Sequence, residues 1–134
     1  MNRATSVPAT DMSRVVVDAS ALAALVFREP DGEVMAARLD GAAVFAPTLL
    51  KFELANLAWK KARRQPADAA AILMALERAL DDRSGLVWRD VDHADAVLVA
   101  QATGLSTYDA SYLWLAGTLG ADLVTLDRRL ASVS

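Results

Sequence analysis

The sequence contains no cysteine and a single histidine, His93. The absence of cysteine excludes disulfides and zinc–thiolate sites, and it agrees with a chain that works in a reducing cytoplasm. One histidine leaves little room for His-based catalysis or for a His-rich metal site. Any chemistry that this chain performs must therefore rest mostly on carboxylates.

Long apolar runs and phosphate-binding loops are also missing. No apolar run reaches the ~18 residues that a membrane-spanning helix needs, and the first residues, MNRATSVPATDMSR, lack the apolar core of a secretory signal. There is no G-x-G-x-x-G or Walker A loop, which disfavours a nucleotide-binding or phosphotransfer α/β domain. A net charge of −3 counts weakly against a general nucleic-acid-binding surface. It leaves room for an enzyme that meets nucleic acid through a metal and a local basic patch.

Length and composition predict one compact domain. The chain has 134 residues, of which 54% are hydrophobic, enough to bury a core without covalent staples. Residues 1–13 are polar and carry no periodicity, so we expect a flexible tail there and a folded domain over 14–134. Met12 offers an alternative start, and whether residues 1–11 belong to the natural protein is left open.

Short apolar runs alternate with longer helical patterns along this domain. We expect strands at 14–18, 42–47, 86–91 and 121–127, and helices at 19–28, 30–41, 48–64, 68–83, 92–103 and 107–119. Gly104 and Gly120 are placed to close the last two helices. Strands that alternate with helices predict an α/β fold with a mainly parallel sheet and right-handed crossovers.

Three aspartates stand at the ends of these elements, and each has two interpretations. Asp18 and Asp127 each end an apolar strand, and Asp109 lies in the first turn of a helix after Ser106. Aspartate is a favoured helix cap, so Asp18 could cap the helix after it, Asp127 a short helix over 128–130, and Ser106–Asp109 could form a capping box. The other interpretation is that the three carboxylates share a cation.

Glu53 has no such cap explanation because it lies in the middle of a helix. At 100° per residue its side chain falls within the apolar stripe of TLLKFELANLAWK, between Leu49 and Leu57. A buried contact with Asn56 or Lys60 would be a purely structural reason for this position, since buried charges are usually paired.

All four carboxylates are expected at the same edge of the sheet. Ligands of parallel α/β sheets bind beyond the carboxyl ends of the strands, where Asp18, Glu53, Asp109 and Asp127 would converge. Four carboxylates in one cleft repel one another unless a cation neutralises them. Oxygen ligands without Cys or His indicate Mg²⁺ or Mn²⁺, and one or two such ions would support phosphodiester hydrolysis by an activated water.

Three segments carry a family resemblance: VVVDASAL, TLLKFELANLAWKKA around Glu53, and LSTYDASYLWLAGTLGADLVTLDRRL. Together they resemble a PIN-domain ribonuclease of the VapC toxin type, from about Arg14 to the end of the chain. The motif Y-D-A-x-Y-x-x-L-A and the following V-T-x-D carry most of the specificity. The family's acidic quartet falls on Asp18, Glu53, Asp109 and Asp127. The residues before the first strand depart from the pattern, since the family's first Asp usually lies nearer the N-terminus.

The resemblance implies a three-layer α/β/α sandwich around a mainly parallel sheet of four to five short strands. It implies an Mg²⁺- or Mn²⁺-dependent endoribonuclease toxin of the bacterial or archaeal cytoplasm, acting on tRNA or rRNA. It also implies a homodimer, and a VapB-type antitoxin that neutralises the toxin in a heterotetramer or larger assembly. The sequence gives neither the RNA target nor the cleavage site.

Other residues are assigned to supporting roles, each with a structural alternative. Ser20, Thr107 and Thr125 would hold a water or a neighbouring acid, or serve as caps and core residues. The basic residues would form an RNA track or remain solvated; they are Lys60, Lys61, Arg63, Arg64, Arg128 and Arg129. Of the aromatic residues, Phe52, Trp59, Trp88, Tyr108, Tyr112 and Trp114 are expected in the core or in dimer contacts, with base stacking as the alternative.

The apolar helices between residues 19 and 39 are expected to form the antitoxin groove. A non-catalytic PIN-like module that binds RNA or protein is the alternative function. It is disfavoured because all four acids are present.

Overall fold

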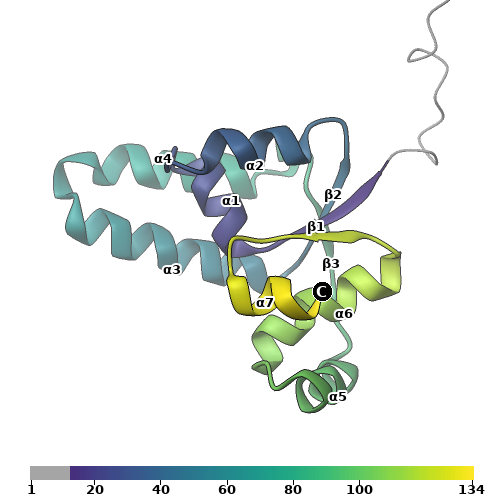
Figure 1. Cartoon of the computed structure of the whole chain (residues 1–134). Helices are drawn as coiled ribbons and strands as arrows, with labels where there is room; N and C mark the ends of the chain where they lie inside the picture. Colours follow the sequence, from purple (N-terminus) through teal and green to yellow (C-terminus); the bar gives the residue numbers. More distant parts are fainter. Residues whose placement is uncertain (1–12) are drawn as a thin grey trace, which may run out of the picture.

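The computed structural model describes residues 13–134 (Figure 1). The expected tail at 1–13, apart from Ser13, and the alternative start at Met12 lie outside the described residues. No helix within residues 13–134 is long and apolar enough to cross a membrane.

The sheet has four strands, all parallel, in the order β3-β2-β1-β4. The strands are β1 (Arg14–Val17), β2 (Ala43–Pro47), β3 (Val87–Arg89) and β4 (Asp122–Val124). The two central strands, β1 and β2, contain the apolar runs RVVV and AVFAP, as expected for strands that are covered on both faces. The expected fold, an α/β sandwich with a parallel sheet of four to five strands, is confirmed.

Helices connect these strands in two groups. The helices are α1 (Ala19–Val26), α2 (Gly32–Leu39), α3 (Leu49–Arg64), α4 (Ala69–Leu80), α5 (His93–Thr103), α6 (Thr107–Leu119) and α7 (Arg128–Val133), with 3₁₀ turns at η3 (Pro66–Asp68) and η4 (Asp82–Ser84). The chain steps from β1 to β2 to β3 in one direction and returns from β3 to β4, so right-handed crossovers put α1 to α4 on one face and α5 and α6 on the other. Figure 1 shows these two layers, and α3 and α4 extend from the sheet as a hairpin.

The hydrophobic core lies on both faces of β1. Its largest fully buried side chains include Leu50 and Leu54 of α3 on one face and Tyr112 and Leu115 of α6 on the other. Apolar positions of α3 therefore fix the rotation of that helix, and with it the direction in which Glu53 points. The same holds for α6 and Asp109, because Tyr112 lies one turn beyond Asp109.

The ends of α5 and α6 were predicted correctly, and the end of β4 was not. Gly104 and Gly120 adopt left-handed φ angles of 76° and 60° and end α5 and α6, as predicted. The predicted strand over 121–127 was too long, because β4 ends at Val124. Asp127 is therefore not the last residue of a strand; it is the N-cap of α7.

Candidate acidic site

Four elements bring the four predicted acids to the carboxyl edge of the sheet. Asp18 follows β1, and Asp127 lies three residues beyond the end of β4. Glu53 is on the second turn of α3, which starts beside the end of β2. Asp109 is in the first turn of α6, and this helix runs back along the sheet to β4. The convergence that the sequence predicted is therefore present in the fold.

Asp18 is the most firmly held of the four. The residue is 5% exposed, and its side chain accepts hydrogen bonds from the backbone N–H of Ala21 at 2.9 Å and the hydroxyl of Ser20 at 2.7 Å. Its second oxygen accepts a hydrogen bond from the hydroxyl of Thr125. The carboxylate therefore caps α1 and also ties β1 to the segment after β4.

Asp127 is connected to Asp18 through Thr125. The hydroxyl of Thr125 accepts a hydrogen bond from the N–H of Asp127 at 2.9 Å. The Asp127 carboxylate in turn accepts from the N–H groups of Arg129 and Leu130 at 2.9 and 3.1 Å. The cap interpretation is correct for both Asp18 and Asp127. It does not compete with a ligand role, because a capping carboxylate still has lone pairs free to bind a cation.

Glu53 is partly buried and does not cap a helix. Its carboxylate accepts a hydrogen bond from the hydroxyl of Tyr112 on α6. Burial raises its pKa, the Tyr112 hydrogen bond opposes this shift, and the charges of Asp109 and Asp18 add to it. The expected structural partners, Asn56 and Lys60, make no side-chain hydrogen bond or ion pair with Glu53 within the described residues. The partner that the sequence did not reveal is Tyr112.

Asp109 shows the same electrostatic conflict. Its N–H is capped by the hydroxyl of Ser106 at 3.1 Å, which is half of the predicted capping box. Burial raises the pKa of its carboxyl, and the charges of Asp127 and Asp18 raise it further, while Ser106 and Arg129 act in the opposite direction. Each of the four acids therefore takes part in charge repulsion with at least one of the others.

A divalent cation would relieve this repulsion, and the donor chemistry fits one. All the side-chain ligands on offer are carboxylate oxygens, which suit Mg²⁺ and Mn²⁺. Within residues 13–134, however, no group of three or more His, Cys, Asp or Glu side chains is arranged to enclose a metal ion. Mg²⁺ does not require such an enclosure, because it usually keeps several waters and binds one or two carboxylates together with substrate phosphates.

The supporting hydroxyls differ from one another. Ser20 and Thr125 hold Asp18, and Ser20 also accepts a hydrogen bond from the N–H of Leu126 at 3.1 Å. Thr107 is exposed at the start of α6, and no hydrogen bond among the described residues links it to an acid. Thr107 is therefore neither a core residue nor the cap of α6, which is Ser106.

The basic residues differ in their contacts. Lys61 is paired with Glu29 at 3.3 Å, and the guanidinium of Arg63 lies 4.8 Å from the centre of the Trp59 ring. Arg64, at the end of α3, is about 17 Å along the helix from Glu53. Arg129 lies nearest to the acids: it donates to the carbonyl of Gly104 at 2.5 Å, and its charge lowers the pKa of Asp109. Lys60 and Arg128 are exposed.

The aromatic residues divide into two groups. Tyr112 is buried, Trp88 and Trp114 are partly buried, and Phe52, Trp59 and Tyr108 are exposed. The expectation of core packing therefore holds for the first three only. For the exposed three, dimer contacts and base stacking both stay open.

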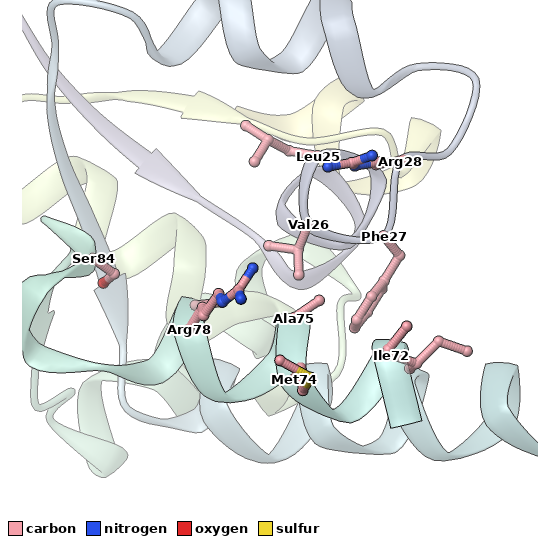
Figure 2. Close-up of a pocket in the computed structure, with 11 residues that line it drawn as sticks. Leu25, Val26, Phe27, Arg28, Ile72, Met74, Ala75, Arg78 and Ser84 are labelled. Atoms are coloured by element: carbon pink, nitrogen blue, oxygen red, sulfur yellow. The ribbon is translucent and has the colours of Figure 1, made fainter. Parts of the chain in front are cut away.

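A cavity lies away from the acids. It has a volume of about 730 Å³ and is formed between the C-terminal end of α1 and the face of α4. In Figure 2 the side chains of Val26 and Phe27 face Ile72 and Ala75 of α4 across it. None of the four acids lines this cavity, so it is a separate feature of the surface.

The parallel sheet and the acids at its carboxyl edge define an α/β domain with an acidic site, and comparison with known proteins gives the family. The model of the PIN domain family matches residues 15–134. The chain belongs to the PIN domain family.

Two curated relatives, both from Pyrobaculum aerophilum, are VapC proteins. Ribonuclease VapC3 is 35% identical over 122 residues, which cover 88% of this chain and 92% of the relative. Exonuclease VapC9 is 39% identical over 79 residues, which cover 59% of this chain and 58% of the relative. The resemblance to VapC-type PIN domains that the motifs carry is therefore confirmed.

Two solved structures share the fold. PAE2754 from Pyrobaculum aerophilum has a TM-score of 0.72 and 31% identity, with 90% of this chain and 78% of that chain covered. VapC20 of Mycobacterium tuberculosis, a toxin that cleaves the sarcin–ricin loop, has a TM-score of 0.64 and covers 90% of this chain and 95% of its own. At 16% identity, the second structure supports the fold alone.

Proposed function

We propose that this protein is a metal-dependent endoribonuclease of the VapC toxin type. The observation that carries the proposal is the cluster of Asp18, Glu53, Asp109 and Asp127 at the carboxyl edge of the sheet, where the carboxylates repel one another. Such an arrangement lowers stability unless a cation or a substrate uses it. Its position is the one at which parallel α/β sheets bind ligands.

The four carboxylates would hold Mg²⁺ or Mn²⁺ directly or through water. A bound ion of this kind supplies charge neutralisation at the scissile phosphate and lowers the pKa of a coordinated water. The protein's part is to fix the ligands: Ser20 and Thr125 hold the Asp18 carboxylate, and Tyr112 holds that of Glu53. Tyr112 stays protonated, because burial and the Glu53 contact both raise the pKa of its phenol. It acts as a permanent donor and not as a base.

RNA is the proposed substrate because the relative that spans most of this chain is a ribonuclease. The other curated relative is an exonuclease, so the mode of cleavage needs its own test. A circular RNA has no ends, and only an endonuclease can open it. We expect the purified protein with Mn²⁺ to linearise a circular transcript, and EDTA to stop the reaction. Cleavage of linear RNA alone would mean an exonuclease.

Asp109→Asn tests the role of the acids in that assay. Asparagine has nearly the same shape and is tolerated in a first helical turn, so the variant should fold with an unchanged circular dichroism spectrum. We expect its cleavage rate to fall by at least about 100-fold, the order of effect for losing one ligand or electrostatic contact at a reacting phosphate. Wild-type cleavage by the folded variant would contradict the metal site. A wild-type protein that cleaves no RNA would favour the non-catalytic PIN-like module.

An antitoxin partner is the second part of the proposal. The cavity of about 730 Å³ is lined by the end of α1, within the 19–39 segment expected to bind the antitoxin, and by α4. Its walls include Phe27, Ile72 and Met74, and Arg28 and Arg78 stand beside them (Figure 2). Apolar walls beside two guanidinium groups fit an amphipathic segment with acidic residues.

Met74→Asp tests this surface, with Leu73→Asp as a matched control. Both residues are about half exposed on α4, at 53% and 49%, but only Met74 lines the cavity. We expect Met74→Asp to lose binding to the protein encoded by the preceding gene and to keep its RNA cleavage. Equal binding by both variants would place the antitoxin elsewhere. Light scattering of the free protein and of the complex would test the expected homodimer and heterotetramer.

A further inference from the structure

A second, smaller cleft borders the first turn of α6, which also carries Asp109. It has a volume of about 240 Å³ and lies between the start of α3, the start of α5 and the first turn of α6. Thr48 and Leu49 line it on the first side, His93 and Val97 on the second, and Thr107 and Tyr108 on the third. We propose that this cleft binds the base of an unpaired nucleotide next to the scissile phosphate, an inference that rests on the proposed ribonuclease function.

Two helices that line the cleft, α3 and α6, also carry acids of the site. Leu49 lies one turn before Glu53 on α3, and Tyr108 is the residue before Asp109 on α6. A nucleotide whose phosphate lies at the acids would therefore have its base within reach of this cleft. The cavity of about 730 Å³ between α1 and α4 has no such connection, because none of its lining residues neighbours an acid of the site in the sequence.

The chemistry of the cleft suits a base. Its walls are apolar at Leu49 and Val97, and Tyr108 is 64% exposed. An exposed aromatic ring beside a single-strand path is a stacking surface, and this stacking tolerates any base. The Thr48 hydroxyl makes no capping bond to α3, and with that of Thr107 it is open to solvent. These hydroxyls and the exposed His93 could read the edge of a stacked base.

The size of the cleft and its neighbours favour a base over a second protein chain. Its 240 Å³ is below the ~300–1,000 Å³ of pockets for drug-sized ligands, so it suits one ring system. A protein surface packed over it would also approach Asp109, which follows Tyr108 in the first turn of α6. Burying an unpaired carboxylate further is costly. RNA instead brings its phosphates, and the cations around them, toward the acids.

The experiment compares Tyr108→Ala, Tyr108→Phe and Val97→Trp with the wild-type chain. Val97→Trp would fill the cleft from α5, and Leu98→Trp is its matched control, because Leu98 is exposed on the same helix but does not line the cleft. Cleavage of an RNA library with a randomised unpaired segment gives the base preference at each position around the cut. Anisotropy of a short unstructured RNA, measured in EDTA, gives affinity without cleavage.

We expect Tyr108→Ala and Val97→Trp to weaken RNA binding by about 5- to 150-fold, the range for removing one stacked base. The base preference should flatten at one position beside the cut, while Tyr108→Phe and Leu98→Trp stay near wild type. Unchanged affinity and preference in both cleft variants would overturn the proposal. So would a change of Val97→Trp from dimer to monomer with its base preference intact, because the cleft would then be an interface between copies. If the wild type cleaves no RNA, the proposed function fails, and the anisotropy data still decide whether the cleft binds RNA.

Discussion

The four acids fall into two pairs that differ in what they do for the fold. Asp18 and Asp127 are helix caps, and their carboxylates accept hydrogen bonds from backbone N–H groups. Glu53 and Asp109 cap nothing with their side chains, and burial together with neighbouring charge raises the pKa of both. The first pair stabilises the protein, and the second pair is under electrostatic strain.

This difference distinguishes carboxylates with a structural role from carboxylates whose role must be functional. A capping carboxylate has a reason to be present even in a protein without a metal. A desolvated carboxylate that repels its neighbours has no such structural reason to be present. Glu53 and Asp109 are therefore stronger evidence for a bound ligand than the two capping aspartates are. Substitutions of the two pairs should therefore change stability in opposite directions.

The largest effect on stability is expected for Asp18→Ala. It removes the cap of α1 and leaves the hydroxyls of Ser20 and Thr125 without their acceptor. We expect the free energy of unfolding to fall by about 2–4 kcal/mol, measured by urea denaturation in EDTA. Asp18→Asn keeps an acceptor oxygen and should recover much of this loss, while RNA cleavage stays absent. Equal stability of Asp18→Ala and wild type would show that the cap contributes nothing.

Tyr112→Phe should have the next largest effect. It removes the hydroxyl that donates to Glu53 and leaves a partly buried carboxylate without that donor. We expect a loss of about 1–2 kcal/mol in EDTA and slower RNA cleavage that added Mn²⁺ partly restores. The matched measurement is the same substitution in a Glu53→Ala background, where the hydrogen bond is already gone. If the cost were the same in both backgrounds, it would reflect ring packing and not the contact with Glu53.

Glu53→Gln should give the smallest change, and in the opposite direction. The pKa of Glu53 is raised in the folded state. The contribution of Glu53 to the free energy of unfolding is therefore fully favourable below its unfolded pKa and is lost as pH rises through its folded pKa. Glutamine stays neutral at every pH and still offers an oxygen to Tyr112. In EDTA at pH 7 the variant should melt a few degrees above wild type, and the difference should vanish below about pH 4. A lower melting temperature at pH 7 would contradict the strain assigned to Glu53.

Much of the fold could be read from the sequence because its signals are local. Each of these signals depends on a few neighbouring residues: the buried strand RVVV, the apolar stripe of the helix around Glu53, and the glycines at 104 and 120 that end helices. The convergence of the acids followed from parallel topology alone, since all strands end at one edge.

The errors arose where a tertiary contact replaced a local pattern. Residues 121–127 are a short, mostly apolar run typical of a strand, but the pairing with β1 ends at Val124. Beyond it, the Thr125 hydroxyl bonds to Asp18 and to the N–H of Asp127, which bends the chain into α7. Tyr112 was expected to be an ordinary core or dimer residue, since nothing in the sequence shows that α6 meets α3 at Glu53. Its position three residues after Asp109, on the same helix face, was the available signal.

Thermal unfolding with and without Mn²⁺ tests the central claim most directly, because it requires no knowledge of the RNA. If the acids bind a divalent cation, saturating Mn²⁺ should raise the melting temperature of the wild type, since an ion bound only by the folded state adds RT ln(1 + [L]/Kd) to stability. The rise should be much smaller in Asp109→Asn and in Glu53→Gln, and Leu98→Trp should respond as the wild type does. An unchanged wild-type melting temperature, or an equal rise in all four proteins, would contradict a metal site at these carboxylates.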